Sequence, residues 1–215
     1  MRTGEQTIAA FCEQVAASTP APGGGAVAAV AGAMGASLVS MVGGLTRGRE
    51  KFQEVEADMA AAQEAGRREA EALLDLADQD QAAFSQVMAA FALPRGTPEE
   101  KAERRKAVQA AYREATRTPL ETMAHCLAVM RHALAVVAKG NPNAVSDGCV
   151  GFLVASAGFE GALWNVAINL DGIKDEAFRH ETIAKVERMR EEREEVLQAF
   201  HALTPDPVVR FLKQQ

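Results

Sequence analysis

Apolar residues recur at helical spacing along most of the chain, whereas the two-residue alternation typical of strands is scarce. Clusters of proline and glycine near 20–25, 93–98, 139–148 and 171–172 divide this pattern into segments. The predicted helices span about 8–15, 26–45, 46–91, 98–139, 146–170 and 176–203. The expected fold class is all-α, an up-and-down helical bundle of about six helices in a single domain, 1–215.

Two of these helices, 26–45 and 150–170, are nearly all-apolar, so both are expected to be buried nearly all round. Four glycines lie in the first of them, and each costs about 1 kcal/mol relative to alanine inside a helix. The cost is offset if the glycines allow tight helix packing, within the subunit or across a two-fold dimer axis. The alternative is that they leave room for a flat ligand beside the backbone. The four are Gly32, Gly35, Gly43 and Gly44.

Local signals refine the other helices. Thr97 followed by Pro98, Glu99 and Glu100 supplies an N-cap, a first-turn proline and first-turn acids, and so predicts a helix start. Pro119 predicts a kink or break in the helix that follows. The helix 176–203 has an apolar stripe and many Glu/Arg pairs, the pattern of a solvated helix that covers a core.

Composition narrows the class of protein. The net charge is −6 with a pI near 5.3, which gives no basic surface for nucleic acid. Three scattered cysteines indicate no disulfide framework and a reducing, cytoplasmic setting. The run 26–45 is long enough to cross a bilayer, but alanine, glycine and serine dilute it and no basic or aromatic flank accompanies it. We therefore expect no membrane span.

The loop before that run, "PAPGGGAVA", is the first candidate for chemistry. It lacks the lysine of a phosphate-binding loop and the spaced glycines of a dinucleotide fingerprint. A glycine-rich helix start nevertheless exposes several N–H groups at the positive end of the helix dipole, where a carboxylate, a carbonyl or the edge of a heterocycle can bind. The alternative is a tight turn that needs glycine only for positive φ.

Asp80 is the second candidate, because it falls in phase with the apolar stripe of its helix. It follows Leu73 by seven residues and Ala77 by three, and it precedes Phe84 by four. A carboxylate on a buried stripe is costly unless it is paired, and such groups are frequent in active sites, although some only tie helices together. Asp78 points elsewhere and is expected to be solvated.

A second polar loop, "GNPNAVSDG", places four polar side chains at the start of the apolar helix 146–170. One of them could be an ordinary helix cap, yet two asparagines, a serine and an aspartate exceed what one cap needs. Asn165 and Asn169 add amides farther along the same helix. The four histidines form no metal-ligand pattern, and no serine or cysteine lies in a nucleophile elbow. The four polar residues of the loop are Asn141, Asn143, Ser146 and Asp147.

Together these segments resemble the cyclodeaminase/cyclohydrolase family of folate enzymes. The matching stretches are "STPAPGGGAVAAVAGAMGASLVSMV", "DQDQAAFSQVMAAFALPRGTPEEKAERRKAVQAA", "TPLETMAHC" and "GNPNAVSDGCVGFLVASAGFEGALWNVAINL". The family includes the C-terminal half of formiminotransferase-cyclodeaminase and stand-alone methenyltetrahydrofolate cyclohydrolases. The resemblance implies an all-α homodimer that acts on a tetrahydrofolate one-carbon substrate, with no permanently bound cofactor and no metal.

The resemblance also suggests residue roles. A cyclohydrolase adds water to 5,10-methenyltetrahydrofolate, and a cyclodeaminase closes 5-formiminotetrahydrofolate and releases ammonia; the motifs do not separate the two. Asp147 is the leading general-base candidate, and Asp80 is a partner carboxylate or pterin anchor. Arg95, or Arg47, would meet the glutamate tail of the folate. The expected pocket wall consists of Pro22, Gly23, Gly24, Gly25, Asn141, Asn143, Ser146 and Asn165.

A different class of function stays open from the sequence: a helical dimer that binds a ligand without catalysis. Against it stand the in-phase Asp80 and the polar loop at 141–147, neither of which a pure scaffold needs.

Overall fold

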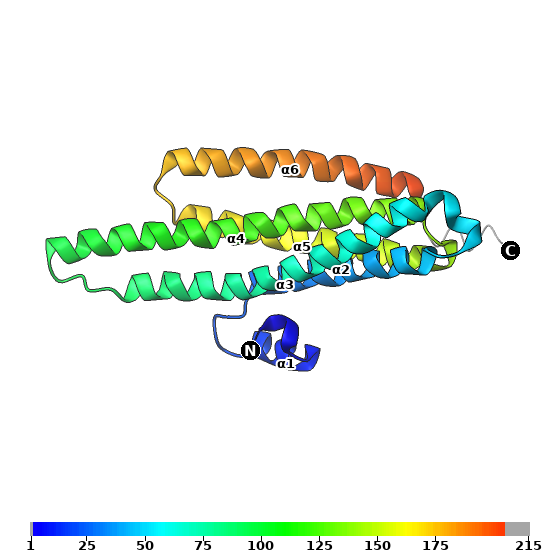
Figure 1. Cartoon of the computed structure of the whole chain (residues 1–215). Coiled ribbons are helices and arrows are strands. Elements are labelled where there is room, and N and C mark those ends of the chain that lie inside the picture. Colours follow the sequence, from blue (N-terminus) through cyan, green and yellow to red (C-terminus); the bar gives the residue numbers. More distant parts are fainter. Residues whose placement is uncertain (1, 205–215) are drawn as a thin grey trace.

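The computed structural model describes residues 2–204, and these are helical nearly throughout, with no strand among them (Figure 1). The predicted all-α class is confirmed. Pro205 and Pro207, which we expected in a tail, lie outside the described residues. The α-helices are α1 Ile8–Ala16, α2 Gly24–Thr46, α3 Glu56–Ala92, α4 Pro98–Lys139, α5 Val145–Asp171 and α6 Glu176–Leu203. Three short 3₁₀ helices are η1 Thr3–Glu5, η2 Glu50–Val55 and η3 Pro142–Ala144.

Helices α2 to α5 run up and down in a bundle, and α6 lies along α4 at its outer edge (Figure 1). The α3–α4 hairpin projects beyond the start of α2, so its far end needs a small core of its own. The short α1 lies apart from the bundle on the opposite side from α6, and none of its residues is buried. The core of the hairpin consists of Ala83, Val87, Ala90, Ala111 and Ala115.

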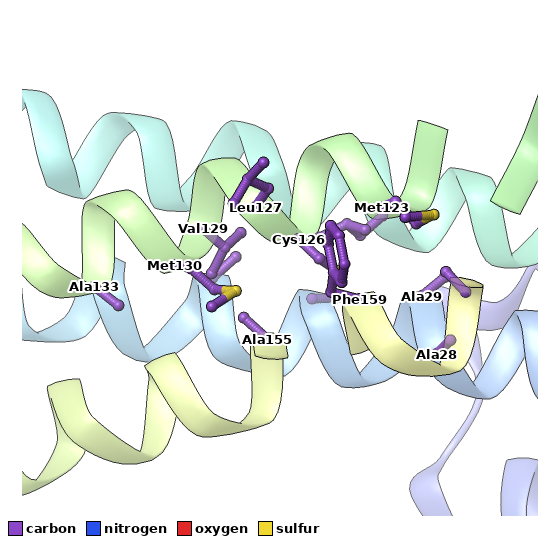
Figure 2. Packing of buried hydrophobic residues seen from close by; sticks show 14 of the residues in the cluster. Ala28, Ala29, Met123, Cys126, Leu127, Val129, Met130, Ala133, Ala155 and Phe159 are labelled. Carbon is purple, nitrogen blue, oxygen red and sulfur yellow. The ribbon is translucent and has the colours of Figure 1, made fainter. Parts of the chain in front are cut away.

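Glycine sets the spacing between the central helices. A Cβ added to Gly35 of α2 would lie 2.7 Å from the carbonyl oxygen of Gly151 in α5, and one added to Gly66 of α3 would lie 2.6 Å from the carbonyl oxygen of Ala36. Such distances leave no room for a side chain, so the backbones themselves are in contact. Close packing within the subunit therefore accounts for these glycines. Figure 2 shows Phe159 of α5 in the core nearby, with Ala28 and Ala29 of α2 to one side and Cys126 and Met123 of α4 close to the ring.

Two predicted features of the long helices came out differently. The segment 46–91 does not begin as one helix, because Gly48 adopts a left-handed φ of 68° and η2 intervenes before α3. Of the kink or break predicted at Pro119, the break is absent, because α4 runs on through the proline. Because proline has no N–H, the carbonyl of Ala115 one turn earlier has no helical donor, and it accepts a hydrogen bond from Asn169 Nδ2 of α5 at 2.7 Å. The capping box of Thr97 and Glu100 is formed as the sequence predicts.

The expectation that α2 and α5 are buried nearly all round is wrong for the single chain. Each helix keeps one exposed apolar stripe along its length. In α2 the buried positions are mostly glycine and alanine, and the larger side chains face outward. The exposed side chains are Val27, Met34, Met41 and Leu45 of α2, and Val150, Leu153, Trp164 and Ile168 of α5.

Three segments, Gly24–Thr46, Pro98–Lys139 and Pro142–Asp171, have the length and apolar composition that a membrane crossing requires. Their apolar character also has a source within the bundle, since each contributes many of the fully buried side chains of the common core. Length and composition alone do not distinguish a membrane-spanning helix from a helix buried in the core of a bundle.

The N-terminal segment is fastened to α3 by an aspartate. Asp78 Oδ1 accepts hydrogen bonds from the backbone N–H of Thr3 at 2.8 Å and from its hydroxyl at 2.5 Å, and Arg2 pairs with Asp75 and Asp78. Asp78 is therefore a tether and not the solvated residue that we expected. It holds the chain that precedes α1 beside the same helix that carries Asp80.

Backbone contact at Gly35 yields a stability prediction. Gly35→Ala forces α2 and α5 apart, and we expect a loss of about 1–3 kcal/mol in the free energy of unfolding. Gly44→Ala is the matched control in the same helix, because its nearest neighbour is the flexible end of the Gln63 side chain at 2.7 Å. There the gain in helix propensity of about 1 kcal/mol should keep stability unchanged or raise it. Urea denaturation of both variants measures the two changes in the free energy of unfolding. Equal losses of stability would contradict the conclusion that backbone contact requires glycine at position 35.

Candidate active site

The glycine loop ends in an open helix start. Gly23 is the N-cap of α2 and provides no side-chain cap, so the first N–H groups of the helix have no side-chain acceptor from that residue. Among residues 2–204 only Gly48 has positive φ, so the alternative that these glycines serve a left-handed turn is excluded. Pro22 is buried beside them and Gly24 is exposed. Of the three glycines, only Gly25 is required for space, because a Cβ on Gly23 or Gly24 would make ordinary contacts.

Asp80 occupies that space. A Cβ added to Gly25 would overlap the carboxylate, at 2.7 Å from Asp80 Oδ2 and closer still to Oδ1. The backbone N–H of Ala26 donates a hydrogen bond to the same carboxylate, at the positive end of α2. Partial burial raises the pKa of Asp80 above its ordinary value, and the hydrogen bond from Ala26 offsets only part of this rise. The site thus holds a carboxyl group that is less acidic than usual.

Asn165 joins this group from α5. A Cβ on Gly24 would lie 3.5 Å from Asn165 Nδ2 and 3.9 Å from Oδ1, so the amide lies beside the helix start. Its Nδ2 donates to the carbonyl oxygen of Gly161 at 2.8 Å, which fixes the amide along its own helix. The structure therefore brings together four predicted elements: the glycine loop, the start of α2, Asp80 and Asn165.

The second polar loop lies at the other end of α2. The N–H of Asn141 donates to Thr46 Oγ1 at 2.9 Å, and its Nδ2 donates to the carbonyl oxygen of Leu45 at 3.3 Å. Its Oδ1 accepts from the N–H of Asn143 at 3.1 Å, so Asn141 has the cap role that we considered as an alternative. Asn143 itself is exposed.

Asp147 and Ser146 follow Asn141 and its neighbours in the first turn of α5. Ser146 is exposed and is not the N-cap, because α5 begins one residue earlier. Asp147 lies eighteen residues before Asn165 on the same helix, which is about five turns or 27 Å. Within one chain, the structure does not bring Asn141, Asn143, Ser146 and Asp147 together with Asp80 and the glycine loop.

The two candidate arginines are also separated from the glycine loop. Arg95 is exposed in the turn between α3 and α4, beyond the end of a helix segment that extends about 18 Å past Asp80. Arg47 caps the opposite end of α2, where its guanidinium donates to Gln63 at 2.7 Å and pairs with Glu56 at 3.3 Å. Neither side chain contacts Asp80 in the part of the chain that the structure describes.

One polar cluster escaped the sequence analysis because its members come from different helices. His125 Nδ1 of α4 lies 2.6 Å from Glu69 Oε2 of α3. The hydrogen bond to Glu69 raises the pKa of His125, and the same bond lowers the pKa of Glu69. Burial lowers the pKa of the neighbouring His132. Residues 2–204 contain no group of three His, Cys, Asp or Glu side chains placed to hold a metal ion.

The fold thus defines a class: an all-helical domain with a carboxylate held against the start of a glycine-rich helix. Residues 7–188 match the model of the formiminotransferase-cyclodeaminase family. The methenyltetrahydrofolate cyclohydrolase of Methylorubrum extorquens is 43% identical over 184 residues, which cover 86% of this chain and 88% of that protein. The chain belongs to the formiminotransferase-cyclodeaminase family.

Further likenesses agree with this assignment. The formimidoyltransferase-cyclodeaminase of Rattus norvegicus is 35% identical over 189 residues, which cover 87% of this chain but only 35% of that longer protein. A crystal structure of formiminotetrahydrofolate cyclodeaminase from Thermotoga maritima superposes with a TM-score of 0.84 at 30% identity, and the match covers 93% of this chain and 96% of that one.

The position of Gly25 leads to a prediction about activity. Gly25→Ala pushes the Asp80 carboxylate away from the start of α2, and we expect turnover to fall on the order of 10²-fold, since displacements of about 1 Å have such effects. Gly44→Ala is the control, because it lies at the other end of α2, where the added Cβ would meet only the flexible end of the Gln63 side chain. Steady-state rates and circular dichroism of both variants test this; a Gly25→Ala protein as active as wild type would refute the assignment of Asp80.

The Glu69–His125 pair predicts a pH-dependent stability. The raised pKa of His125 contributes stability below its unfolded value of 6.5, which is lost as pH rises through the folded pKa. The lowered pKa of Glu69 contributes stability above 4.5, which is lost as pH falls. Glu69→Gln should therefore lower the Tm more at pH 6 than at pH 9. Glu121→Gln, which removes a weaker influence on His125, should change the Tm little.

Proposed function

We propose that the chain is a methenyltetrahydrofolate cyclohydrolase, which hydrolyses 5,10-methenyltetrahydrofolate to 10-formyltetrahydrofolate. The observation that carries the proposal is the Asp80 carboxylate, held against Gly25 at the positive end of α2 and made less acidic by burial. The similarity to the Methylorubrum extorquens cyclohydrolase supports the choice of reaction. Partly buried carboxyl groups with a raised pKa are concentrated in active sites, which favours an enzyme over a ligand-binding protein without catalysis.

The proposed reaction requires one base and one positioned water. The carbon between N5 and N10 of the substrate is an electrophilic, cationic amidinium, so it needs no metal or covalent nucleophile to be attacked. As water adds to this carbon, Asp80 takes a proton from the water. The bond from carbon to N5 then breaks as Asp80 returns its proton to N5, and the added hydroxyl loses its own proton to solvent and becomes the carbonyl of the formyl group on N10. The net reaction consumes one water and releases one proton. Proton transfer of this kind contributes about 10²–10⁴-fold.

The remaining groups near Asp80 would hold the substrate. The backbone N–H groups at the start of α2 are donors for a carbonyl of the pterin ring, and the Asn165 amide can both donate and accept at a heterocycle edge. Since Asp147 lies about five turns away in the same chain, the role of base passes from Asp147 to Asp80 in this proposal. We further propose that the enzyme has no permanently bound cofactor, because the substrate itself carries the one-carbon unit.

Cyclodeaminase activity is the second candidate, and one observation favours it as well. A carboxyl group with a raised pKa can keep its proton and donate it to departing ammonia when N10 attacks the formimino carbon. The printed names of the mammalian relatives and of the Thermotoga maritima structure include this activity. The same site geometry serves either reaction, so the substrate must be distinguished by assay.

We also propose a soluble, cytoplasmic homodimer that binds neither nucleic acid nor a membrane. The acidic net charge of −6 gives no favourable electrostatic term for nucleic acid or anionic lipid. Helices α2 and α5 each leave a stripe of four large apolar side chains exposed, and contiguous exposed apolar surface of this kind marks interaction sites, so a second copy would cover both stripes. Recovery of the protein from the supernatant without detergent would support this over a membrane span.

The function is tested by offering both substrates to the purified protein. We expect loss of the near-ultraviolet absorbance of methenyltetrahydrofolate, and no ammonia from formiminotetrahydrofolate. Asp80→Asn should lower the rate by about 10²–10⁴-fold. Because the raised pKa of Asp80 makes its ionisation unfavourable in the fold, stability falls as pH rises through that pKa, so Asp80→Asn should not lower the Tm at pH 7. Ammonia release without hydrolysis would favour the second candidate.

A further inference from the structure

Helix α2 begins at the candidate site, whereas α3 continues past it. The first turn of α2, which starts at Gly24, lies level with Asp80 of α3. Helix α3 runs on from Asp80 to Ala92, about 18 Å, and the α3–α4 hairpin projects beyond the start of α2 (Figure 1). Helix α2 therefore cannot cover the last three turns of α3.

The face of α3 that packs on α2 stays apolar along this extension. Leu73 lies against Gly32 of α2, and residues seven, eleven and eighteen positions later return to the same side of α3 to within about 20°. These three residues are Asp80, Phe84 and Phe91. The carboxylate of the candidate site is thus followed by two phenylalanines in line with it.

The core does not take up these side chains. Phe84 is half-buried and belongs to neither hydrophobic cluster of the described residues, and Phe91 keeps 40% of its surface exposed. Met88, between them, is 51% exposed. Single exposed apolar residues are normal, but three along one face form a continuous apolar surface. We call Phe84, Met88 and Phe91 the apolar track; it leads away from Asp80.

A fixed cation lies at the far end of the apolar track. Arg104 of α4 donates from Nε and Nη2 to the carbonyl oxygen of Phe91, at 3.1 and 3.0 Å, and its guanidinium lies 5.3 Å from the centre of the Phe91 ring. An edge-to-face contact with Tyr112 holds that ring in turn. Within residues 2–204 no carboxylate forms an ion pair with Arg104, so its positive charge is available to a ligand.

We propose that the apolar track and Arg104 bind the p-aminobenzoyl-glutamate arm of the folate substrate, with Phe84 against the benzoyl ring and Arg104 paired with a glutamate carboxylate. The inference rests on the proposed function, which places the reacting carbon at Asp80. The arm carries two carboxylates and the chain has a net charge of −6, so a local cation is needed to offset the repulsion. Arg104 thereby takes the role that the sequence suggested for Arg95 or Arg47.

The dimensions of the arm fit the apolar track. The benzoyl ring is bonded to N10, next to the reacting carbon, and Phe84 lies one turn or about 6 Å beyond Asp80. From the reacting carbon to the far carboxylate, the extended arm measures about 13 Å. Phe91 lies about 16 Å beyond Asp80, so a hydrogen bond of about 3 Å completes the distance to Arg104.

A substrate without glutamate tests the role of Arg104. 5,10-Methenyltetrahydropteroate keeps the pterin and the benzoyl ring but lacks the glutamate. Arg104→Gln should raise the KM for 5,10-methenyltetrahydrofolate about 10-fold, leave kcat within about two-fold, and leave the KM for the pteroate unchanged. Arg105→Gln is the matched control, because it removes the same charge from an exposed neighbour that points about 100° away. Equal rises in KM for both substrates, or the same rise in Arg105→Gln, would overturn the inference.

Phe84→Ala tests the position of the ring. Both substrates contain the benzoyl group, so this variant should raise both KM values about 5–10-fold, with unchanged helical circular dichroism. A KM equal to that of wild type for both substrates would overturn the placing of the ring against Phe84.

Equilibrium binding separates this inference from the proposed function. 5-Formyltetrahydrofolate and 5-formyltetrahydropteroate differ only in the glutamate, and neither contains the methenyl bridge that is hydrolysed. By calorimetry, Arg104→Gln should bind the folate about 10-fold more weakly than wild type and the pteroate equally well. Equal binding of the folate by both proteins would overturn the inference. If wild-type protein shows this difference but hydrolyses no methenyl substrate, the proposed function alone fails.

Discussion

The structure depends on direct backbone contact between α2 and its neighbours. Gly35 meets Gly151 of α5, and Gly66 of α3 meets the backbone of α2 at Ala36. Because no side chain separates these helices, even one added methyl group at these positions would push them apart. The same closeness continues to the first turn of α2, where Gly25 leaves room only for the carboxylate of Asp80. The candidate site is thus a direct continuation of the core packing.

This packing also determines what α2 shows to the outside. Small residues are needed where backbones touch, so the larger apolar side chains of α2 have only the outer face available. The helix is therefore apolar on both sides for two separate reasons. Inside, small residues allow approach; outside, large residues form a surface that water does not favour.

Much of this was accessible from the sequence, since helical periodicity and the proline–glycine clusters predicted the six helices, all to within a few residues except the start of α3, which lies ten residues after the predicted position. Asp80 was identified because it falls in phase with Leu73 and Phe84. Residues in phase lie on one face of a helix, and the sequence alone determines this spacing. The sequence could not show that the loop at 141–147 lies at the other end of α2. The order of motifs along the chain does not tell which end of the bundle each motif occupies. The Glu69–His125 pair joins residues 56 positions apart, and no local pattern announces such a contact.

Pro119 has a consequence beyond its own helix. Helix surfaces made of glycine and alanine have few protruding side chains. Two such helices can therefore shift by one turn along their axes and lose little contact area. The proline leaves the carbonyl of Ala115 in α4 without a helical donor, and this carbonyl accepts a hydrogen bond from the Asn169 amide of α5. The bond favours one register of α5 along α4. Asn169 is one turn from Asn165, so the same hydrogen bond also sets the position along α4 of Asn165, the amide beside Gly24. Pro119, a residue type that usually breaks helices, thus helps to set the register between α4 and α5.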